Sequence, residues 1–239
     1  QVSKRTSLFI AKPRVVHLWR NAGCNGRCVM CYFGFRTGDA RKELFRLTIP
    51  DETIPRLLDQ IHELGGRGTM VSYMGGEPLL AAPLLVWVEQ ASALGLDFRF
   101  TTNGYLIDEE VARRLVAANL FNIGVSLESL DPKINEQIRP LAHGTAKHVR
   151  AIELLIAERQ RQSARLSINI KCTLTQLNFE SLAGILERWG TIDGVIVTPQ
   201  VFEALPGMPP ETRDRLWPAD WGGLEAAMQK LRQMRSAGY

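Results

Sequence analysis

The feature that most constrains the fold of this chain is a regular alternation of short apolar segments with longer segments of helical periodicity. Segments with the length and pattern of a β-strand cover residues 15–19, 69–74, 98–102, 122–127, 166–174 and 195–198. Segments with helical spacing or capping residues cover residues 53–64, 84–94, 108–118, 145–162, 179–189 and 224–235. Such alternation predicts an α/β protein with parallel strands and right-handed crossovers. Six units are too few for a closed eight-stranded barrel, so an open, partial barrel or a doubly wound sheet remains.

Two of the expected strands carry polar residues at every second position. Residues 122–128 and 166–174 each alternate apolar side chains with polar ones such as Asn169 and Lys171. Side chains alternate across a strand, and a parallel strand buried on both faces should be apolar throughout. We therefore expect the polar faces to line a barrel interior that holds a polar ligand. Cys172 falls on the apolar face of its strand and is expected to be a buried core thiol.

Three of the four cysteines lie within eight residues, at Cys24, Cys28 and Cys31, in the loop after the first expected strand. A disulfide framework would spread its cysteines along the chain, so this grouping favours a metal site in a reducing compartment, and we expect a cytoplasmic protein. An electron-transfer [4Fe–4S] cluster takes four cysteine ligands, whereas three ligands leave one iron open to a small molecule. A structural zinc site needs four ligands, usually in two pairs, and the sequence shows no second pair.

Length, charge and hydropathy narrow the remaining classes. A chain of 239 residues is long enough for one large domain with a buried core. The net charge is +4, but the lysines and arginines are scattered, so a nucleic-acid partner is not indicated. No apolar stretch approaches the ~20 residues of a membrane span. The sequence starts with Gln1 rather than Met, and we expect a cropped or processed chain.

The cysteine spacing resembles a known family signature. Written C-x3-C-x-Φ-C, with Met30 in the Φ position, it is similar to the motif of the radical S-adenosylmethionine (SAM) superfamily. Further matching segments follow in order: Gly-Gly-Glu-Pro at 75–78, Thr-Thr-Asn-Gly at 101–104, Ser-Leu-Glu-Ser at 126–129, and Asn169 and Lys171 on the fifth strand. The resemblance runs from about Val15 to Thr198. It implies a partial (β/α)6 TIM-like barrel, a [4Fe–4S] cluster on the three cysteines, and SAM as the second cofactor.

The resemblance also assigns SAM-binding residues. In the family, the amino and carboxylate groups of SAM chelate the open iron, and the ammonium group would be received by Gly75, Gly76 and Glu77. The other implied contacts are Thr101 and Asn103 with the methionyl part or ribose, Ser126 and Glu128 with the ribose hydroxyls, and Lys171 or Arg139 with the SAM carboxylate. Glu128 stands where aspartate is frequent in the family, so its carboxylate has the longer reach.

The activity implied by the resemblance is reductive cleavage of SAM to methionine and a 5′-deoxyadenosyl radical, which abstracts a hydrogen atom from the substrate. The expected partners are a peptide or small-molecule substrate and a low-potential electron donor of the flavodoxin or ferredoxin type. The sequence does not identify the substrate or any catalytic residue beyond the cofactor contacts. Phe33, Phe35 and Arg36 follow the cysteine loop and are interpreted either as packing residues or as residues that shield the cluster or meet the substrate.

The cues to a subfamily differ along the chain. Its shortness resembles the glycyl-radical-enzyme activases, whereas residues 122–139 resemble the branch of molybdenum-cofactor cyclases and SPASM-type peptide maturases, which we favour. We expect residues 1–216 to form a radical SAM core and residues 217–239 a bridging helix that leads into a C-terminal extension absent from this chain. A non-catalytic Fe–S protein for electron transfer or redox sensing, and a zinc-stabilised binding module, are the alternatives from other classes.

Overall fold

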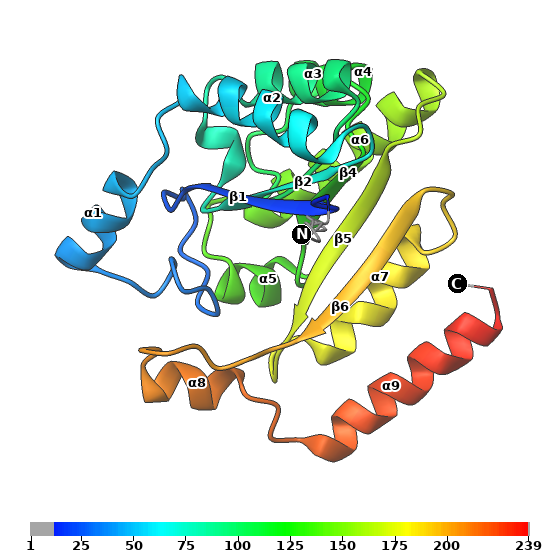
Figure 1. Cartoon of the computed structure of the whole chain (residues 1–239). Helices are drawn as coiled ribbons and strands as arrows, with labels where there is room; N and C mark the ends of the chain where they lie inside the picture. Colours follow the sequence, from blue (N-terminus) through cyan, green and yellow to red (C-terminus); the bar gives the residue numbers. More distant parts are fainter. Residues whose placement is uncertain (1–11, 239) are drawn as a thin grey trace, which may run out of the picture.

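The computed structural model describes residues 12–238 and contains one parallel six-stranded sheet (Figure 1). The strands are β1 Val15–Asn21, β2 Met70–Gly75, β3 Asp97–Thr102, β4 Asn122–Ser126, β5 Ser167–Leu174 and β6 Val195–Val201. They are hydrogen-bonded in sequence order, and every pairing is parallel. A doubly wound sheet reverses its strand order at a switch point. The unbroken order therefore selects the partial barrel and confirms the expected α/β class.

Helices connect the strands and cover the sheet. They are α1 Gly38–Arg46, α2 Thr53–Gly65, α3 Leu84–Leu94, α4 Glu109–Ala117, α5 Pro132–Ile138, α6 Gly144–Arg161, α7 Leu182–Trp189, α8 Pro210–Leu216 and α9 Trp221–Ser236, with 3-10 turns η1 Pro78–Leu80 and η2 Phe179–Ser181. Figure 1 shows α2, α3, α4 and α6 along one side of the sheet. The hydrophobic core lies between these helices and the strands, where Val71, Phe98 and Ile123 are almost fully buried. Within residues 12–238, no helix has the length and apolarity to cross a bilayer.

Burial alternates along β5 as its sequence pattern predicts. Ile168, Ile170, Cys172 and Leu174 are buried, and the residues between them are half-buried. Cys172 is 1% exposed and belongs to the hydrophobic core, so the expected core thiol is confirmed. The opposite face of β5 is left to line the interior of the curved sheet.

Three short helices lie in stretches where the sequence predicts no helix. The helix α1 falls in the polar connection 36–50, and it buries only Leu44, so it has too few apolar residues to show a helical period. The helices α5 and α8 begin at Pro132 and Pro210, which read as loop residues. Proline favours the first helical position because its φ angle is preset and its missing N–H has no intrahelical partner there.

The start of α6 differs from the prediction by its capping residue. The sequence pattern begins this helix at Thr145 as its capping residue, but the helix begins at Gly144 and is preceded by His143 with a φ of +55°. The Thr145 hydroxyl instead accepts a hydrogen bond from the Asn135 amide of α5 at 3.0 Å. Thr145 therefore joins α5 to α6, because the unpredicted α5 brings a buried amide to it.

Candidate functional site

The three clustered cysteines lie in the loop after β1, at the carboxyl end of the sheet. Cys28 is buried, while Cys24 and Cys31 are half-buried. A Cβ atom on Gly26 would lie 3.6 Å from the Cys24 sulfur and 3.5 Å from the Cys28 sulfur, so these two thiols face one space beside Gly26. Burial raises the pKa of the Cys24 thiol to about 12, although the Gly26 N–H, 3.3 Å from the sulfur, lowers it. The loop therefore gathers thiols around a glycine that leaves room between them.

One arginine that the sequence analysis did not single out holds this loop together. Arg41 of α1 donates hydrogen bonds from its guanidinium to the carbonyl oxygens of Cys24 at 2.9 Å, Gly26 at 3.2 Å and Phe33 at 2.9 Å. A guanidinium carries several donors in a rigid plane and can join several carbonyl groups at once. Arg41 thus fixes both ends of the cysteine loop against α1.

The Gly75-Gly76-Glu77 segment contacts the cysteine loop through its backbone. The N–H of Gly76 donates to the carbonyl of Asn21 at 3.0 Å, and the N–H of Glu77 donates to the carbonyl of Gly23 at 2.8 Å. A Cβ atom on Gly75 would lie 1.9 Å from the Asn21 oxygen, and one on Gly76 would lie 1.8 Å from the Gly23 oxygen. Gly75 also has a φ of +140°. Both positions require glycine because the two backbones meet there.

The Glu77 carboxylate is buried, with 2% of the residue exposed. It accepts hydrogen bonds from the N–H of Leu79 at 3.1 Å, from the N–H of Asn103 at 2.8 Å and from the Thr102 hydroxyl. Burial raises the pKa of Glu77, and these donors lower it in part. Among residues 12–238 the carboxylate has no ion-pair partner. Glu77 therefore ties the end of β2 to the end of β3 without a contacting cation, although the more distant positive charge of Arg139 also lowers its pKa.

The Asn103 side chain links the turn after β3 to the cysteine loop. Its Nδ2 donates to the Asn25 side-chain oxygen at 2.7 Å, and its Oδ1 accepts from the Tyr105 N–H at 2.9 Å. Thr101, for which the same ligand is predicted, lines a cavity inside the sheet. The structure therefore places Asn103 beside the cysteine loop and Thr101 deeper along β3.

Glu128 and Arg139 form a buried ion pair that reaches the cysteines. Arg139 Nη2 lies 2.6 Å and Nε 2.7 Å from the Glu128 Oε1, and the other carboxylate oxygen accepts from the Thr173 N–H. Arg139 Nη1 donates to the Cys28 sulfur at 3.3 Å. The sequence analysis assigned these two residues to separate parts of SAM, whereas the structure joins them to each other and to Cys28. Ser126 is buried at the end of β4, where it pairs in register with Lys171.

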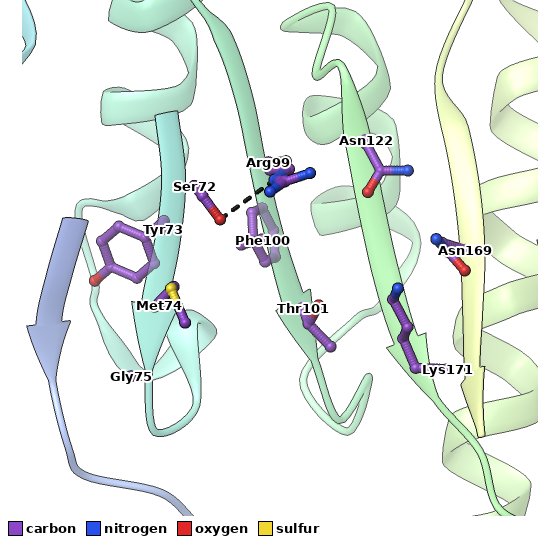
Figure 2. Close-up of a pocket in the computed structure, with 10 residues that line it drawn as sticks. All are labelled: Ser72, Tyr73, Met74, Gly75, Arg99, Phe100, Thr101, Asn122, Asn169 and Lys171. Carbon is purple, nitrogen blue, oxygen red and sulfur yellow. Dashed lines mark hydrogen bonds between the residues drawn. The ribbon is translucent and has the colours of Figure 1, made fainter. Parts of the chain in front are cut away.

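The polar faces of the strands line a cavity of about 340 Å³ inside the curved sheet (Figure 2). Its polar lining residues come from β2 to β5 and include Ser72, Arg99, Thr101, Asn122, Asn169 and Lys171. The expected polar interior is therefore present. The sequence did not indicate a role for Arg99, because its apolar neighbours Phe98 and Phe100 identify a strand but not the function of its other face.

The aromatic residues after the cysteines pack against one another and against β1. The ring of Phe33 makes edge contacts with Trp19 at a centroid distance of 6.0 Å and with Tyr32 at 5.7 Å. The guanidinium of Arg36 lies 4.4 Å from the centre of the Tyr32 ring, and Phe35 also meets this ring. The structure supports the packing interpretation of these residues.

The spacing of the cysteines and other metal-binding side chains limits which metal groups they can hold. Among residues 12–238, no three His, Cys, Asp or Glu side chains come close enough together to hold one. Sulfur ligands of a tetrahedral zinc ion lie about 4 Å apart, because each zinc–sulfur bond is about 2.3 Å long. In a [4Fe–4S] cluster each thiolate binds a different iron, so the sulfurs are more widely spaced. Among the described residues, the three cysteines are therefore not arranged around a single metal ion.

Comparisons with known proteins agree with the sequence resemblance. The family model of the Radical SAM superfamily matches residues 21–171. The chain is 23% identical over 209 residues to an AdoMet-dependent heme synthase of Methanosarcina barkeri, which covers 87% of this chain and 56% of the relative. It is 26% identical over 187 residues to a probable GTP 3′,8-cyclase of Methanopyrus kandleri, which covers 78% of this chain and 55% of the relative.

The fold is similar to that of solved structures. SuiB of Streptococcus suis bound to S-adenosylmethionine superposes with a TM-score of 0.72 at 16% identity, over 95% of this chain and 48% of SuiB. SuiB has also been solved bound to its precursor peptide SuiA. The chain thus spans about half the length of the proteins it matches. A GTP 3′,8-cyclase and a mycofactocin maturase are among the similar proteins, in agreement with the branch that the sequence favoured.

Proposed function

This chain belongs to the radical SAM superfamily and is an enzyme, and we propose that it holds a [4Fe–4S] cluster on Cys24, Cys28 and Cys31 and binds SAM beside it. Enzymes of this family use these two groups as cofactors. When bound, they supply a carbon-centred radical by one-electron cleavage of SAM, and that radical removes a hydrogen atom from the substrate. Membership of an enzyme family removes the non-catalytic Fe–S reading.

The observation that carries the proposal is the convergence of three strand ends on the cysteine loop. The loop after β1 is fixed by Arg41, by the backbone of Gly76 and Glu77, and by Asn103 acting through Asn25. A ligand loop held from several sides keeps its thiols in place before the metal arrives. Such pre-organisation is expected of a loop that must leave one iron open for SAM.

Glu77 supports the placement of SAM. Its buried carboxylate is held only by neutral donors among the described residues. A buried charge is costly unless a countercharge accompanies it. The SAM ammonium and sulfonium groups provide positive charge, and we place the ammonium near Glu77, Gly75 and Gly76. The other predicted SAM contacts, namely Thr101, Asn103, Ser126, Glu128, Arg139 and Lys171, stay predictions.

The wider activity is proposed on the same basis. The substrate is a peptide or a small-molecule biosynthetic intermediate, and the electron donor is a low-potential flavodoxin or ferredoxin. The complex of SuiB with a precursor peptide and the similarity to a heme synthase support one kind of substrate each. We also propose a cytoplasmic location, because all four cysteines are free and thiols persist in reducing compartments.

The proposed division of the chain places the core in residues 1–216 and a bridging helix in residues 217–239. The last helix, α9, begins at Trp221, with the Asp220 side chain accepting from the Gly223 N–H at 2.9 Å. It packs against α7 and η2 on the outside of the barrel.

The experiment is anaerobic reconstitution with iron and sulfide, followed by incubation with SAM and dithionite. We expect about four irons per chain and formation of 5′-deoxyadenosine. Cys28→Ala should lose both, because it removes a proposed ligand. Cys172→Ala is the matched control, since it removes an equally buried thiol from the core and should retain both. Binding of zinc alone, with no deoxyadenosine, would contradict the proposal.

A further inference from the structure

The cavity inside the sheet extends from the cysteine end of the barrel into its interior. Gly75 lines the cavity and also touches Asn21 at the start of the cysteine loop. Arg99 lies deeper, because it pairs in register with Ser72 and Asn122 rather than with residues at the carboxyl ends of the strands. The volume of about 340 Å³ is in the range of small-molecule sites. A molecule in this cavity would therefore lie next to the proposed radical chemistry.

Among residues 12–238, two cations line the cavity and no carboxylate does. Arg99 projects from β3 and Lys171 from β5, and the other lining side chains are neutral. Figure 2 shows the side chain of Lys171 extending toward Arg99 and Asn122, with its amine nearest to them. Both positively charged groups therefore face the same cavity.

Neither cation is neutralised within residues 12–238. Arg99 Nε donates to the Ser72 hydroxyl at 3.2 Å, which is an uncharged acceptor, and Lys171 forms no ion pair. Residues 1–11 contain no aspartate or glutamate. Burial and, to a smaller extent, Arg99 lower the pKa of Lys171. This contrasts with Arg139, whose buried charge is balanced by Glu128.

Neutral amides complete the lining between the two cations. With its amide oriented so that the nitrogen donates to the Thr198 hydroxyl at 2.6 Å, the Asn169 oxygen accepts from Lys171 Nζ at 3.3 Å. Asn122 lines the cavity at the level of Arg99. Amides and cations of this kind recognise oxygen-rich anions through charge-assisted hydrogen bonds. Among the described residues, the cavity lining therefore carries positive charge and no negative charge to balance it.

We propose that this cavity binds an anionic small-molecule substrate, with Arg99 and Lys171 holding its carboxylate or phosphate oxygens, which leaves Arg139 as the residue for the SAM carboxylate. The proposal rests on the proposed function and specifies its substrate class. The anionic end of the substrate lies deep in the barrel at Arg99, and its reacting part is directed toward Gly75 and the cysteine loop. A planar guanidinium suits bidentate contact with either kind of anion.

The first experiment measures binding of pyrophosphate and of citrate to the full chain by isothermal titration calorimetry, with and without SAM. These probes separate a phosphate from a carboxylate preference. We expect Arg99→Gln to weaken binding of the preferred anion by about tenfold or more, because the substitution removes a charged hydrogen-bond partner. Arg165→Gln removes an exposed arginine and should leave binding unchanged. Arg99→Lys keeps the charge but loses the planar guanidinium, so it should bind the anion less tightly than wild type and more tightly than Arg99→Gln. Lys171→Gln should also weaken anion binding, and it serves if Arg99→Gln does not fold.

A second readout separates the substrate anion from the carboxylate of SAM. Arg99→Gln should retain SAM affinity and dithionite-driven formation of 5′-deoxyadenosine, because Arg99 lies below the strand ends. If the wild-type chain does not cleave SAM, the proposed function is refuted. The calorimetric anion binding still tests the cavity separately. The inference is overturned if the wild-type chain binds neither probe at millimolar concentration, or if Arg99→Gln binds both as tightly as wild type.

Discussion

Two buried glutamates flank the cysteine loop, and the structure balances their charges in different ways. Glu128 is paired with Arg139, which in turn contacts the Cys28 sulfur. Glu77 receives hydrogen bonds only from uncharged donors. A buried carboxylate with its own cation needs no ligand, whereas one without a cation has an open charge. The comparison teaches that Glu128 holds Arg139 within the protein, and it makes Glu77 the carboxylate that we propose for the positively charged part of SAM.

The largest expected effect comes from breaking the internally balanced pair. Glu128→Gln leaves Arg139 buried without its countercharge, and we expect a loss of about 3–5 kcal/mol in the free energy of unfolding. Urea denaturation of the metal-free chain under reducing conditions measures it. Glu153→Gln, which breaks an exposed pair with Arg188, should cost less than about 1 kcal/mol. Equal losses in the two variants would remove the structural role that we give to Glu128.

The next effect concerns the clamp on the cysteine loop. Arg41→Lys keeps the charge but cannot reach the three carbonyl oxygens in one plane, and we expect a loss of about 1–3 kcal/mol. Hydrogen exchange of residues 24–33 should rise, and iron content after reconstitution should fall. Arg46→Lys is the control on the same helix, because Arg46 is exposed and pairs only with Glu43. Unchanged exchange and iron content in Arg41→Lys would show that the loop does not depend on this residue.

Glu77→Gln tests the open charge directly. The amide preserves the size of the side chain but removes its charge, so SAM affinity should fall by about tenfold. Calorimetric titration of the reconstituted protein with SAM gives this value. Glu89→Gln, which alters an exposed ion pair with Arg114, is the control and should bind SAM normally. Wild-type affinity in Glu77→Gln would place the SAM ammonium elsewhere.

The smallest effect is the pH dependence of stability that Glu77 contributes. Because burial raises its pKa, the native carboxyl holds a proton at pH values where the unfolded one has lost it. The contribution of Glu77 to stability is therefore complete below its ordinary pKa of about 4.3 and declines as the pH rises through the raised pKa. The metal-free Glu77→Gln chain should gain stability relative to wild type as the pH rises. A difference between the two chains that stays constant with pH contradicts this account.

The sequence predicted the parts of the molecule that repeat or have distinctive spacing. The period of β5 placed Cys172 in the core, and the cysteine spacing located the loop that Gly76 and Asn103 contact. It did not predict the Glu128–Arg139 pair, because the short helix α5 that turns Arg139 back toward Glu128 buries only two residues. Interactions made by single side chains across a turn leave no period in a sequence.

The same reasoning explains why two arginines were missed. Arg41 lies on α1, a helix with a single buried residue, so its position near the cysteine carbonyls depends on a helix that the pattern did not predict. Arg99 lies between the buried residues Phe98 and Phe100, which identify the strand but not the use of its other face. Both roles became visible only when the strands and loops were placed in space.

The central claim is that the three cysteines form an incomplete ligand set whose open position is taken by SAM. The most direct measurement is the electron paramagnetic resonance spectrum of the reduced, reconstituted protein before and after addition of SAM. We predict a [4Fe–4S] signal that changes when SAM is added, is lost in Cys24→Ala, Cys28→Ala and Cys31→Ala, and persists in Cys172→Ala. A signal that does not change when SAM is added, or that is lost in Cys172→Ala, would contradict the claim.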